Sequence, residues 1–431
     1  MHKTLYLKEY QNCAAPSEIF SESGEVLIIP ELLGKNYFSL RYKKNDLILQ
    51  AGGFVGFFKL NNNLSIQVES KVNIKNFSRI LALSEGAPSV LNAVEASYQY
   101  LMENIKSINE YLIESFLYFV EQVHLAGFYK EYSTITKSNS FPKGRIDFKK
   151  TFNSLNKTLI TYSFKQRSID TKCNKIVKWM LVELLKNDSF CRIATNKYKV
   201  IKLLNSLSKV TYVRFDKNEL VRIISESYIE RLTYTNYKNL FSIIKIIINQ
   251  WSVDLLSVGK TKAHSIIINL EEVFEKYLLN SLALQNLSLN EISVLDGNKK
   301  GNNGGAKELF SETDDEFFYG ESVIATPDIV VFSSTALANN IVIDVKYKVV
   351  NNVCDRADLN QVVTYMSSYD SCAGVLLIPS HKNTKYKIQC LGSILGGKVY
   401  QYSFNLNADD IIKEEKELLC FLTKILKDNN S

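Results

Sequence analysis

Short apolar runs separated by turn residues dominate the first 80 residues of the chain. Four of these runs have the length of strands, and they are Glu25–Pro30, Asp46–Leu49, Phe54–Lys59 and Leu64–Val68. From about Phe77 to Ala126 the apolar residues recur every three or four positions, which predicts amphipathic helices. The same helical spacing returns at Lys175–Lys186 and at Tyr237–Gln250.

Strands and helices alternate in the last third of the chain. Apolar runs predict strands at Val323–Phe332, Ile341–Lys346, Gly374–Pro379, Tyr386–Cys390 and Lys398–Phe404. Helical periodicity predicts helices at Asn269–Leu284, Ala357–Ser368 and Asp409–Lys427. This alternation is typical of an α/β domain. The polar stretches Asn298–Gly305 and Ser311–Glu316 interrupt the pattern, and we expect an exposed loop there.

The pattern as a whole predicts a mixed α/β chain with three regions. Residues 1–80 would form a β-rich N-terminal domain, and residues 81–262 a mainly helical middle region. Within that middle region, Pro142 and Gly144 mark a basic, hairpin-like loop near residues 137–150. Residues 263–431 would form a C-terminal α/β domain.

Composition narrows the class of protein. The chain has 431 residues, of which 46% are apolar and 23% charged, as in a globular protein of two or three domains. It has no run of 18 apolar residues, and the N-terminal MHKTLYLKEY lacks the apolar segment of a signal peptide, so we expect no membrane association. The seven cysteines form no CxxC pair, which predicts reduced thiols in a cytoplasmic protein. Four histidines leave little material for a zinc site or a histidine-based triad.

Charge is distributed unevenly along the chain. Residues 1–262 contain 37 Lys and Arg against 23 Asp and Glu, whereas residues 263–431 contain 15 against 22. The segment Lys130–Lys217 alone contains 20 basic and 6 acidic residues. A basic segment ahead of an acidic one favours a protein that holds a polyanion in its middle and metal ions near its end. A solvated, lysine-rich surface would give the same counts.

The most informative motif is Pro327-Asp328, followed sixteen residues later by Asp344-Val345-Lys346. Because residues i and i+2 of a strand share a face, Asp344 and Lys346 should point the same way. Charged residues in an apolar strand need a binding partner as their reason for being there, since burying them unpaired costs several kcal/mol. A divalent metal shared by Asp328 and Asp344 supplies one: it would bind a scissile phosphate and acidify a water that Lys346 positions. Lys348 continues the same face and is the substitute for Lys346, while a chance surface ion pair would look identical.

Two neighbouring helices strengthen the metal-site interpretation. Glu275 lies on an apolar stripe with Leu278, Leu279 and Leu282, where a plain surface salt bridge is not expected. Glu271 and Glu272 suit the first turn of the same helix. In the helix after the Asp-x-Lys strand, Gln361 and Tyr365 are spaced i, i+4 and would both reach a phosphate or a metal-bound water, although a polar helix edge would have the same spacing.

These residues resemble the PD-(D/E)xK nuclease superfamily, with its Pro-Asp, Asp-x-Lys, helical Glu and Gln-x-x-x-Tyr motifs. The resemblance extends to the McrC family, the nuclease subunits of the McrBC modified-cytosine restriction system. Further similar features follow the family's order along nearly the whole chain: Lys8-Glu9-Tyr10, Gly53–Gly56, Lys143-Gly144-Arg145-Ile146, Asn174, Val273-Phe274-Glu275, Asp344–Lys348 and Asp358–Tyr365.

The resemblance implies a restriction-endonuclease-like fold for residues 263–431 and a DNA-cleaving function. It implies that Asp328, Asp344 and Glu275 hold Mg²⁺ or Mn²⁺ and that Lys346 is the catalytic lysine. It also implies a partner of the McrB type, an AAA+ GTPase that recognises modified cytosine in double-stranded DNA, whose GTP hydrolysis this chain would stimulate. The sequence itself contains no P-loop, because Asp254 stands where Gly259-Lys260-Thr261 would need a glycine, so we expect the chain to bind no nucleotide.

Other functions remain open from the sequence. A free-standing RecB-like nuclease would share the Gln-x-x-x-Tyr motif, and a non-catalytic adaptor would use the nuclease-like fold only to bind DNA and tune a motor. The basic residues Lys143, Arg145, Lys149 and Lys150 would contact either DNA phosphates or the partner. Our hypothesis places the Pro142–Phe148 loop against the partner.

Overall fold

The computed structural model describes residues 3–44, 46–85, 108–153, 158–186, 194–225, 235–250, 266–287, 291–301, 304–310, 323–333 and 339–428. The chain divides into two compact units: residues 1–104 with 266–431, and residues 105–265. The first unit therefore contains both the β-rich N-terminal region and the α/β region. The stretches Gly259–Thr261 and Ser311–Glu316, which the sequence analysis singled out, lie outside the described residues.

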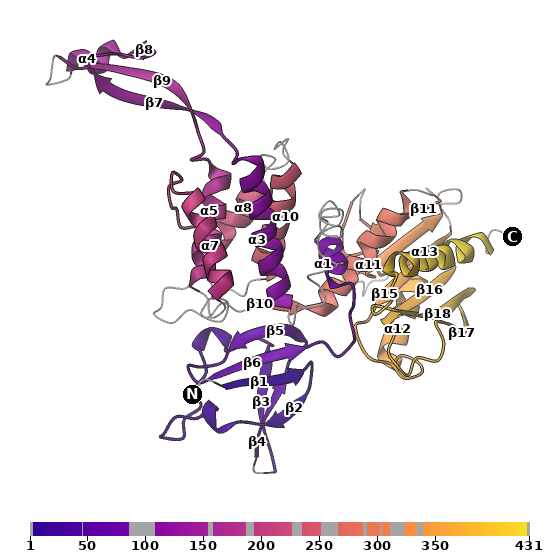
Figure 1. The fold of residues 1–431 in the computed structure, drawn as a ribbon. Coiled ribbons are helices and arrows are strands. Elements are labelled where there is room, and N and C mark those ends of the chain that lie inside the picture. Colours follow the sequence, from indigo (N-terminus) through magenta and orange to yellow (C-terminus); the bar gives the residue numbers. More distant parts are fainter. Residues whose placement is uncertain are drawn as a thin grey trace, which may run out of the picture. The chain divides into compact units, whose positions relative to one another are not determined.

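Two small sheets form the N-terminal part of the first unit (Figure 1). One has the order β1-β6-β5-β10, with β1 at Lys3–Lys8, β6 at Leu64–Glu69, β5 at Phe54–Lys59 and β10 at Ile266–Asn269. The other has the order β2-β4-β3, with β2 at Asn12–Ala14, β4 at Asp46–Ala51 and β3 at Phe38–Lys43. Leu64, Ile66 and Val68 of β6 are buried in a common apolar core with Leu49 of β4. Three of the four strands expected in this region are confirmed.

The fourth expected strand, Glu25–Pro30, is wrong. Apart from an isolated bridge between Phe20 and Val26, this segment makes single backbone hydrogen bonds from Leu27 to Ile19 and from Ile29 to Leu60 rather than a ladder, and a 3-10 turn starts at Pro30. The side-chain amide of Asn61 donates to the carbonyl of Leu27, which occupies an acceptor that a strand partner would need. Pro30 itself has no N–H to donate to a ladder. The segment is therefore held as a loop by scattered backbone bonds and by the Asn61 side chain, despite its apolar composition.

A six-stranded mixed sheet forms the α/β part of the first unit, in the order β11-β14-β15-β16-β18-β17. The strands are β11 at Ile292–Asp296, β14 at Ile329–Ser333, β15 at Asn340–Val345, β16 at Ala373–Pro379, β17 at Ile388–Ile394 and β18 at Gly397–Phe404. Helix α12, Arg356–Tyr369, connects the parallel strands β15 and β16 and packs on both. Val342, Val362, Met366 and Leu376 share the core beneath this helix.

Three further helices complete this part of the unit: α1 at Phe77–Ser84, α11 at Leu270–Asn286 and α13 at Ile411–Asp428. Helix α13 contacts β14 and β15, and α11 packs on α1 and α13. A bidentate ion pair between Arg79 of α1 and Glu415 of α13 lies inside this helix cluster, with nitrogen–oxygen distances of 2.8 and 2.7 Å. The expected helices and strands of this region are confirmed with one correction.

The correction concerns Val323–Phe332, which is not one strand. It divides into β13, Ile324–Ala325, which pairs with β12, Lys307–Glu308, and into β14 of the large sheet. Pro327 lies at the break, and a proline cannot donate to a strand ladder. The break leaves Asp328 just before β14, at an edge where its side chain is free to leave the ladder.

The second unit contains helices and a long β extension (Figure 1). The larger helices are α3 at Ile108–Ala126, α5 at Lys172–Leu185, α7 at Ala194–Ser206, α8 at Lys217–Ser225 and α10 at Thr235–Gln250. The extension consists of β7 at Glu131–Asn139, β8 at Arg145–Ile146, α4 at Phe148–Asn153 and β9 at Ile160–Ser168, with sheet order β7-β9-β8. The extension is longer than the expected loop. Its length was not predicted because β7 and the C-terminal part of β9 expose both faces to solvent and therefore show no alternation of apolar and polar residues.

A buried asparagine holds the base of this extension. Asn174 of α5 donates from its amide nitrogen to the carbonyls of Tyr129 and Ile169, which precede β7 and follow β9, and accepts from the Tyr237 hydroxyl. Because Asn174 and the Tyr237 hydroxyl are buried and the two carbonyls are partly buried, losing the amide would leave several polar atoms unsatisfied. None of the helices among the described residues combines the length and apolar character that a membrane crossing requires.

Candidate active site

Strand β15 ends with the first acidic residue of the predicted pair. Asp344 is only 1% exposed, because β14 and β16 pair with the two edges of this strand. Alternate residues of a strand face the same side, so Asp344 shares its side of the sheet with Val342, in the core beneath α12. An ionised carboxylate in this position needs a compensating positive charge.

Lys346 provides that charge. Its Nζ lies 2.8 Å from Asp344 Oδ2, and its backbone N–H donates to the carbonyl of Leu377. Burial lowers the pKa of Lys346, but the carboxylates of Asp344, Asp328 and Asp358 together raise it by more, so the net direction is upward. The lysine is therefore a persistent ammonium group that faces the acid two residues before it.

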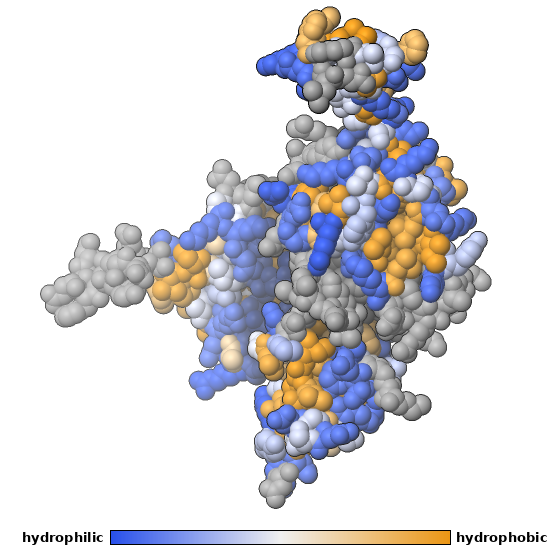
Figure 2. Space-filling view, turned by 90° about the vertical axis from the view of Figure 1, so that its left-hand side faces the viewer, coloured by the Kyte–Doolittle hydropathy of each residue, from blue (hydrophilic) through white to orange (hydrophobic). Residues whose placement is uncertain are grey.

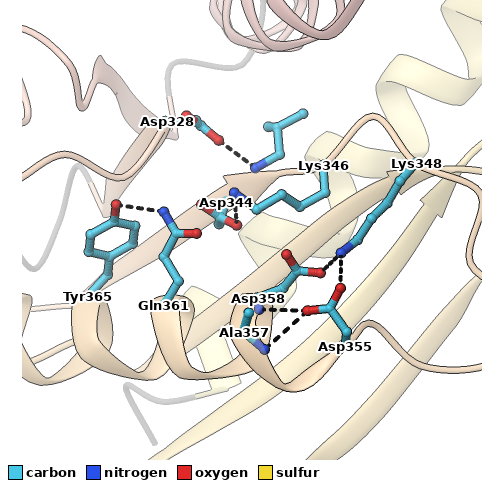
Figure 3. Close-up of polar contacts among 10 residues, drawn as sticks. Asp328, Asp344, Lys346, Lys348, Asp355, Ala357, Asp358, Gln361 and Tyr365 are labelled. Carbon is cyan, nitrogen blue, oxygen red and sulfur yellow. Dashed lines mark hydrogen bonds and ion pairs between the residues drawn. The ribbon is translucent and has the colours of Figure 1, made fainter. Parts of the chain in front are cut away.

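Lys348 is directed elsewhere. Its ammonium forms ion pairs with Asp355, at 2.8 Å, and with Asp358 at the start of α12. Asp355 is also the N-cap of that helix and accepts from the backbone N–H groups of Ala357 and Asp358 (Figure 3). The structure thus brings Lys346, rather than its sequence-based substitute Lys348, to Asp344.

Asp328 approaches the end of β15 from the neighbouring strand. Its Oδ2 accepts a 2.6 Å hydrogen bond from the backbone N–H of Val345, between Asp344 and Lys346. Burial raises the pKa of Asp328 to about 7, the charges of Glu275 and Asp344 add to the rise, and the Val345 N–H and Lys346 oppose it. Pro-Asp and Asp-x-Lys, sixteen residues apart in the sequence, therefore meet directly.

Helix α11 contributes a third carboxylate. Asn269 caps the helix by accepting from the N–H of Glu271, and Glu275 follows one turn later as a half-buried residue. Burial, and next the charge of Asp296, raises the pKa of Glu275, while its Oε1 accepts from Asn298 at 2.9 Å. Glu272 makes an ordinary surface ion pair with Lys276, as its first-turn position predicts.

Gln361 and Tyr365 form one polar edge of α12. The amide of Gln361 donates to the Tyr365 hydroxyl at 2.9 Å, so their i, i+4 spacing does produce contact. Figure 3 shows both side chains pointing from α12 toward the part of the sheet that holds Asp344. Gln361 is exposed and Tyr365 half-buried, which leaves this edge accessible to a ligand.

The donor set suits a hard divalent cation. Asp328, Asp344 and Glu275 offer carboxylate oxygens, and burial raises the pKa of all three, so an added positive charge would be stabilised there. Among the described residues, however, no group of three or more Asp, Glu, His or Cys is arranged to hold a metal by itself.

Lys143, Arg145, Lys149 and Lys150 belong to the β extension of the second unit, whereas the acidic residues belong to the first. Lys150 lies 3.4 Å from Asp147, whose carboxylate also accepts from the Lys150 N–H. These basic residues are thus part of a separate element from the carboxylate site.

Residues 49–379 match the family model of the McrBC 5-methylcytosine restriction system component. The chain belongs to this family. The McrBC family assignment agrees with the resemblance carried by the Pro-Asp and Asp-x-Lys motifs. A search of curated proteins found no match.

Two solved structures are similar to this McrBC-family chain. The first is a refined half-complex from a tetradecameric assembly of Thermococcus gammatolerans McrB AAA+ hexamers with bound McrC, with a TM-score of 0.63 and 15% sequence identity. That match covers 98% of this chain and 100% of the other. The second is a cryo-EM structure of the Thermococcus gammatolerans McrBC complex, with a TM-score of 0.45, 15% identity, and coverage of 66% of this chain and 88% of the other. At this identity the first match shows a shared fold.

One acid near the candidate site, Asp296, was not predicted from the sequence. Asp296, at the end of β11, raises the pKa of Glu275 and forms a 2.8 Å ion pair with Lys299. The next residue, Gly297, lies so close to Pro327 that an added Cβ would be 1.7 Å from its carbonyl oxygen. The apolar run of β11, which ends in Asp296-Gly297, was the sequence feature that could have indicated this acid. The polar, Gly-rich residues that follow it are also typical of a loop.

The raised pKa of Asp328 predicts a pH-dependent effect on stability. Since the folded-state pKa is about 7 against an ordinary 3.8, the folded protein loses stability as pH rises from about 4 to 7. Asp328→Asn keeps an acceptor for the Val345 N–H without the charge, so we expect it to stabilise the metal-free protein by about 1–3 kcal/mol at pH 8. Near pH 4 the difference should vanish.

Thermal unfolding in a chelating buffer at both pH values measures this effect. Asp409→Asn is the matched control, because Asp409 is fully exposed and its pKa is lowered by Lys75. That variant should show little change at either pH. A wild-type protein more stable than Asp328→Asn at pH 8 would contradict the assignment of a destabilising charge to Asp328.

Proposed function

We propose that this chain is the metal-dependent endonuclease subunit of a GTP-driven, modified-cytosine-dependent restriction complex of type IV, active in phage defence. The observation that carries the proposal is the meeting of Asp328, Asp344 and Lys346 at one end of β15, within reach of the charge of Glu275. A surface ion pair of chance origin would not also be buried and joined to a second acid through the backbone between its members.

Each side chain has a role in phosphodiester hydrolysis. Asp328, Asp344 and Glu275 would hold the cation, Mg²⁺ or Mn²⁺, which supplies a Lewis acid for the phosphate and acidifies a water. Lys346, fixed by its ion pair with Asp344, would orient the attacking water and stabilise negative charge that develops on the phosphate. Gln361 and Tyr365 would position the phosphate or the water by hydrogen bonds from the accessible edge of α12.

A partner supplies the motor in this proposal. The McrBC family assignment and the fold shared with an McrC bound to McrB AAA+ hexamers support a partner of the McrB type. The sequence offers no P-loop of its own, so the GTPase and the recognition of modified cytosine in double-stranded DNA are assigned to that partner. The described cysteines are free thiols, which suits a cytoplasmic complex.

The β extension of the second unit is the proposed docking element. Its exposed aromatic side chains, Tyr132, Phe141, Phe148 and Phe152, are each at least 65% exposed. Figure 2 shows hydrophobic side chains beside hydrophilic ones at the end of this extension, at the top of the view. Exposed aromatic residues surrounded by basic ones are typical of a protein interface, whereas phosphate binding alone needs only the charges.

Plasmid cleavage by the purified chain with Mg²⁺ tests the function. Methylated and unmethylated plasmids would be compared with and without the AAA+ partner and GTP. Cleavage that requires partner, GTP and methylated DNA supports the restriction subunit. Cleavage by the chain alone would support a free-standing RecB-like nuclease, and no cleavage under any condition would support a non-catalytic adaptor.

Charge reversal in the extension separates docking from DNA binding. We expect Arg145→Glu with Lys149→Glu to reduce stimulation of the partner's GTPase about tenfold and DNA affinity by less than about threefold. The matched control is Lys202→Glu with Lys209→Glu, two exposed lysines of the same unit outside the extension, which should leave stimulation unchanged. The opposite ranking, with DNA affinity lost and stimulation kept, would place DNA on the extension.

A further inference from the structure

Tyr347 is a buried aromatic residue next to the proposed catalytic lysine. It is 5% exposed, and its hydroxyl lies 2.7 Å from the Ser70 hydroxyl, just after β6 of the N-terminal sheet. The Ser70 hydroxyl also lies 2.6 Å from the carbonyl of Val72, which can accept its proton. Either hydroxyl can donate in the Tyr347–Ser70 bond, and the carboxylate of Glu9 is a second hydrogen-bond partner of the Tyr347 hydroxyl.

Lys71 holds the ring of Tyr347 from the same side. Its ammonium lies 4.7 Å from the centre of the Tyr347 ring and 4.7 Å from the centre of the Tyr10 ring. The backbone N–H of Lys71 donates to Glu9 at 2.9 Å, and Glu9 is 5% exposed. The ammonium of Lys71 thus lies between the rings of Tyr10 and Tyr347. The bond from its backbone N–H to the Glu9 carboxylate fixes the position of its backbone.

The Tyr10 side of this arrangement is built at a conformational cost. Tyr10 has a φ of +61°, in the left-handed region that residues other than glycine rarely adopt. Its ring occupies the space beside Gly53, where an added Cβ would lie 2.2 Å from the Tyr10 hydroxyl. The Tyr10 ring lies against Lys71, and a residue other than glycine held at positive φ commonly marks a functional contact.

The opposite side of Tyr347 meets the helix of the third carboxylate. The rings of Tyr347 and Phe274 are 5.9 Å apart in an edge-to-face arrangement, and Phe274 directly precedes Glu275. Helix α11 also continues from β10, which pairs with β5 in the sheet that contains β6. The N-terminal sheet therefore contacts both Lys346, through Tyr347, and Glu275, through α11.

We propose that Tyr347 is a positioning residue that, clasped by Ser70, Lys71 and Phe274, couples the N-terminal sheet to the placement of Lys346 and Glu275. The inference rests on the proposed nuclease function only for its effect on cleavage. The coupling itself does not depend on catalysis. Tyr347 anchors the segment Val345–Lys348 and so keeps it in register with Asp328 and Leu377.

Substitution of Lys71 tests the coupling without touching the carboxylates. We expect Lys71→Met, which keeps the chain length but loses the cation, to lower kcat for plasmid cleavage about tenfold. The DNA concentration for half-maximal rate and assembly with the partner should be unchanged. Lys71→Arg should recover most of the rate, because a guanidinium also stacks on aromatic faces. Tyr347→Phe should share the loss in kcat, since it keeps the ring and removes the hydroxyl that contacts Ser70 and Glu9.

Lys387→Met is the matched control. Lys387 also lies over a tyrosine ring, that of Tyr402, at 5.7 Å, and forms ion pairs with Glu414 and Glu417 in the same unit. This variant should lose thermal stability and keep kcat. If Lys71→Met behaves in the same way, with a lower Tm and an unchanged kcat, Lys71 has a structural role only and the proposal is overturned.

Amide hydrogen exchange gives a second measurement that does not depend on cleavage. The Val345 N–H is bonded to Asp328 and the Lys346 N–H to Leu377, so both report the position of this segment. We expect both amides to exchange about tenfold faster in Lys71→Met and Tyr347→Phe than in wild type and in Lys387→Met. A wild type that never cleaves DNA would refute the nuclease function alone, whereas unchanged exchange would refute the coupling alone.

Discussion

Lys346→Met should abolish DNA cleavage while leaving the protein folded and able to assemble. The variant keeps the length of the side chain but removes the ammonium 2.8 Å from Asp344, so the attacking water and the developing phosphate charge lose their cation. A preorganised charge of this kind contributes about 10²–10³-fold to a rate. Asp344→Asn, which removes a metal ligand and the partner of Lys346, should lose at least as much. Initial rates of plasmid cleavage with partner and GTP measure both effects.

Lys348→Met is the control for that experiment. Lys348 lies two residues after Lys346 and forms ion pairs with Asp355 and Asp358 instead of Asp344. Its loss should therefore alter the start of α12 and reduce the cleavage rate less than about tenfold. Partner binding should be close to wild type for Lys346→Met, whereas its unfolding temperature should fall, because the buried Asp344 loses its ion-pair partner. A loss for Lys348→Met that equals the loss for Lys346→Met would transfer the catalytic role to the second lysine.

Glu415→Ala should produce the largest loss of stability in the first unit. Glu415 is 1% exposed and accepts from Arg79 through two nitrogens, from the Tyr277 hydroxyl at 2.8 Å and from Gln285 at 2.8 Å. These donors come from α1 and α11, so one carboxylate joins three helices. Removing one partner of a buried ion pair costs about 3–5 kcal/mol, because the remaining charge stays buried. That is a large share of the 5–15 kcal/mol that holds a typical domain folded.

Urea unfolding of Glu415→Ala and of Glu291→Ala gives the matched comparison. Glu291 also pairs with a lysine of α13, Lys427, at 3.0 Å, but both side chains are at least 40% exposed. An exposed pair of this kind contributes about 0–1 kcal/mol. Equal urea midpoints for the two variants would mean that the three-helix contact of Glu415 is not a principal source of stability.

Local sequence patterns predicted most of the α/β region because they report burial directly. The strands β15 and β16 are buried throughout and mostly apolar, and α12 has its apolar residues on one face, so the local pattern of each element is sufficient to predict it. The pattern failed where side chains or solvent decide the conformation. Glu25–Pro30 is apolar yet bound by Asn61, and β7 is a strand without a buried face.

The candidate site divides in the same way. The contact between Asp344 and Lys346 follows from their i, i+2 spacing, and that between Gln361 and Tyr365 from i, i+4 spacing, so both were predictable. Asp296 was not, because its nearness to Glu275 depends on how β11 and α11 pack. No local pattern distinguishes an acid at such a packing contact from one in a solvated loop.

The sequence by itself determined the elements and the chemistry of this protein: a mixed α/β chain, a Pro-Asp and an Asp-x-Lys motif, and a helical glutamate. These are properties of short segments, whose periodicity and spacing are written in consecutive residues. Only the tertiary structure decided which lysine faces Asp344, that the Val345 N–H bonds to Asp328, and that Tyr347 reaches Ser70 across 277 positions. Such contacts depend on strand register and helix packing, which arise from the free energy of the whole folded unit and leave no signature in any one segment.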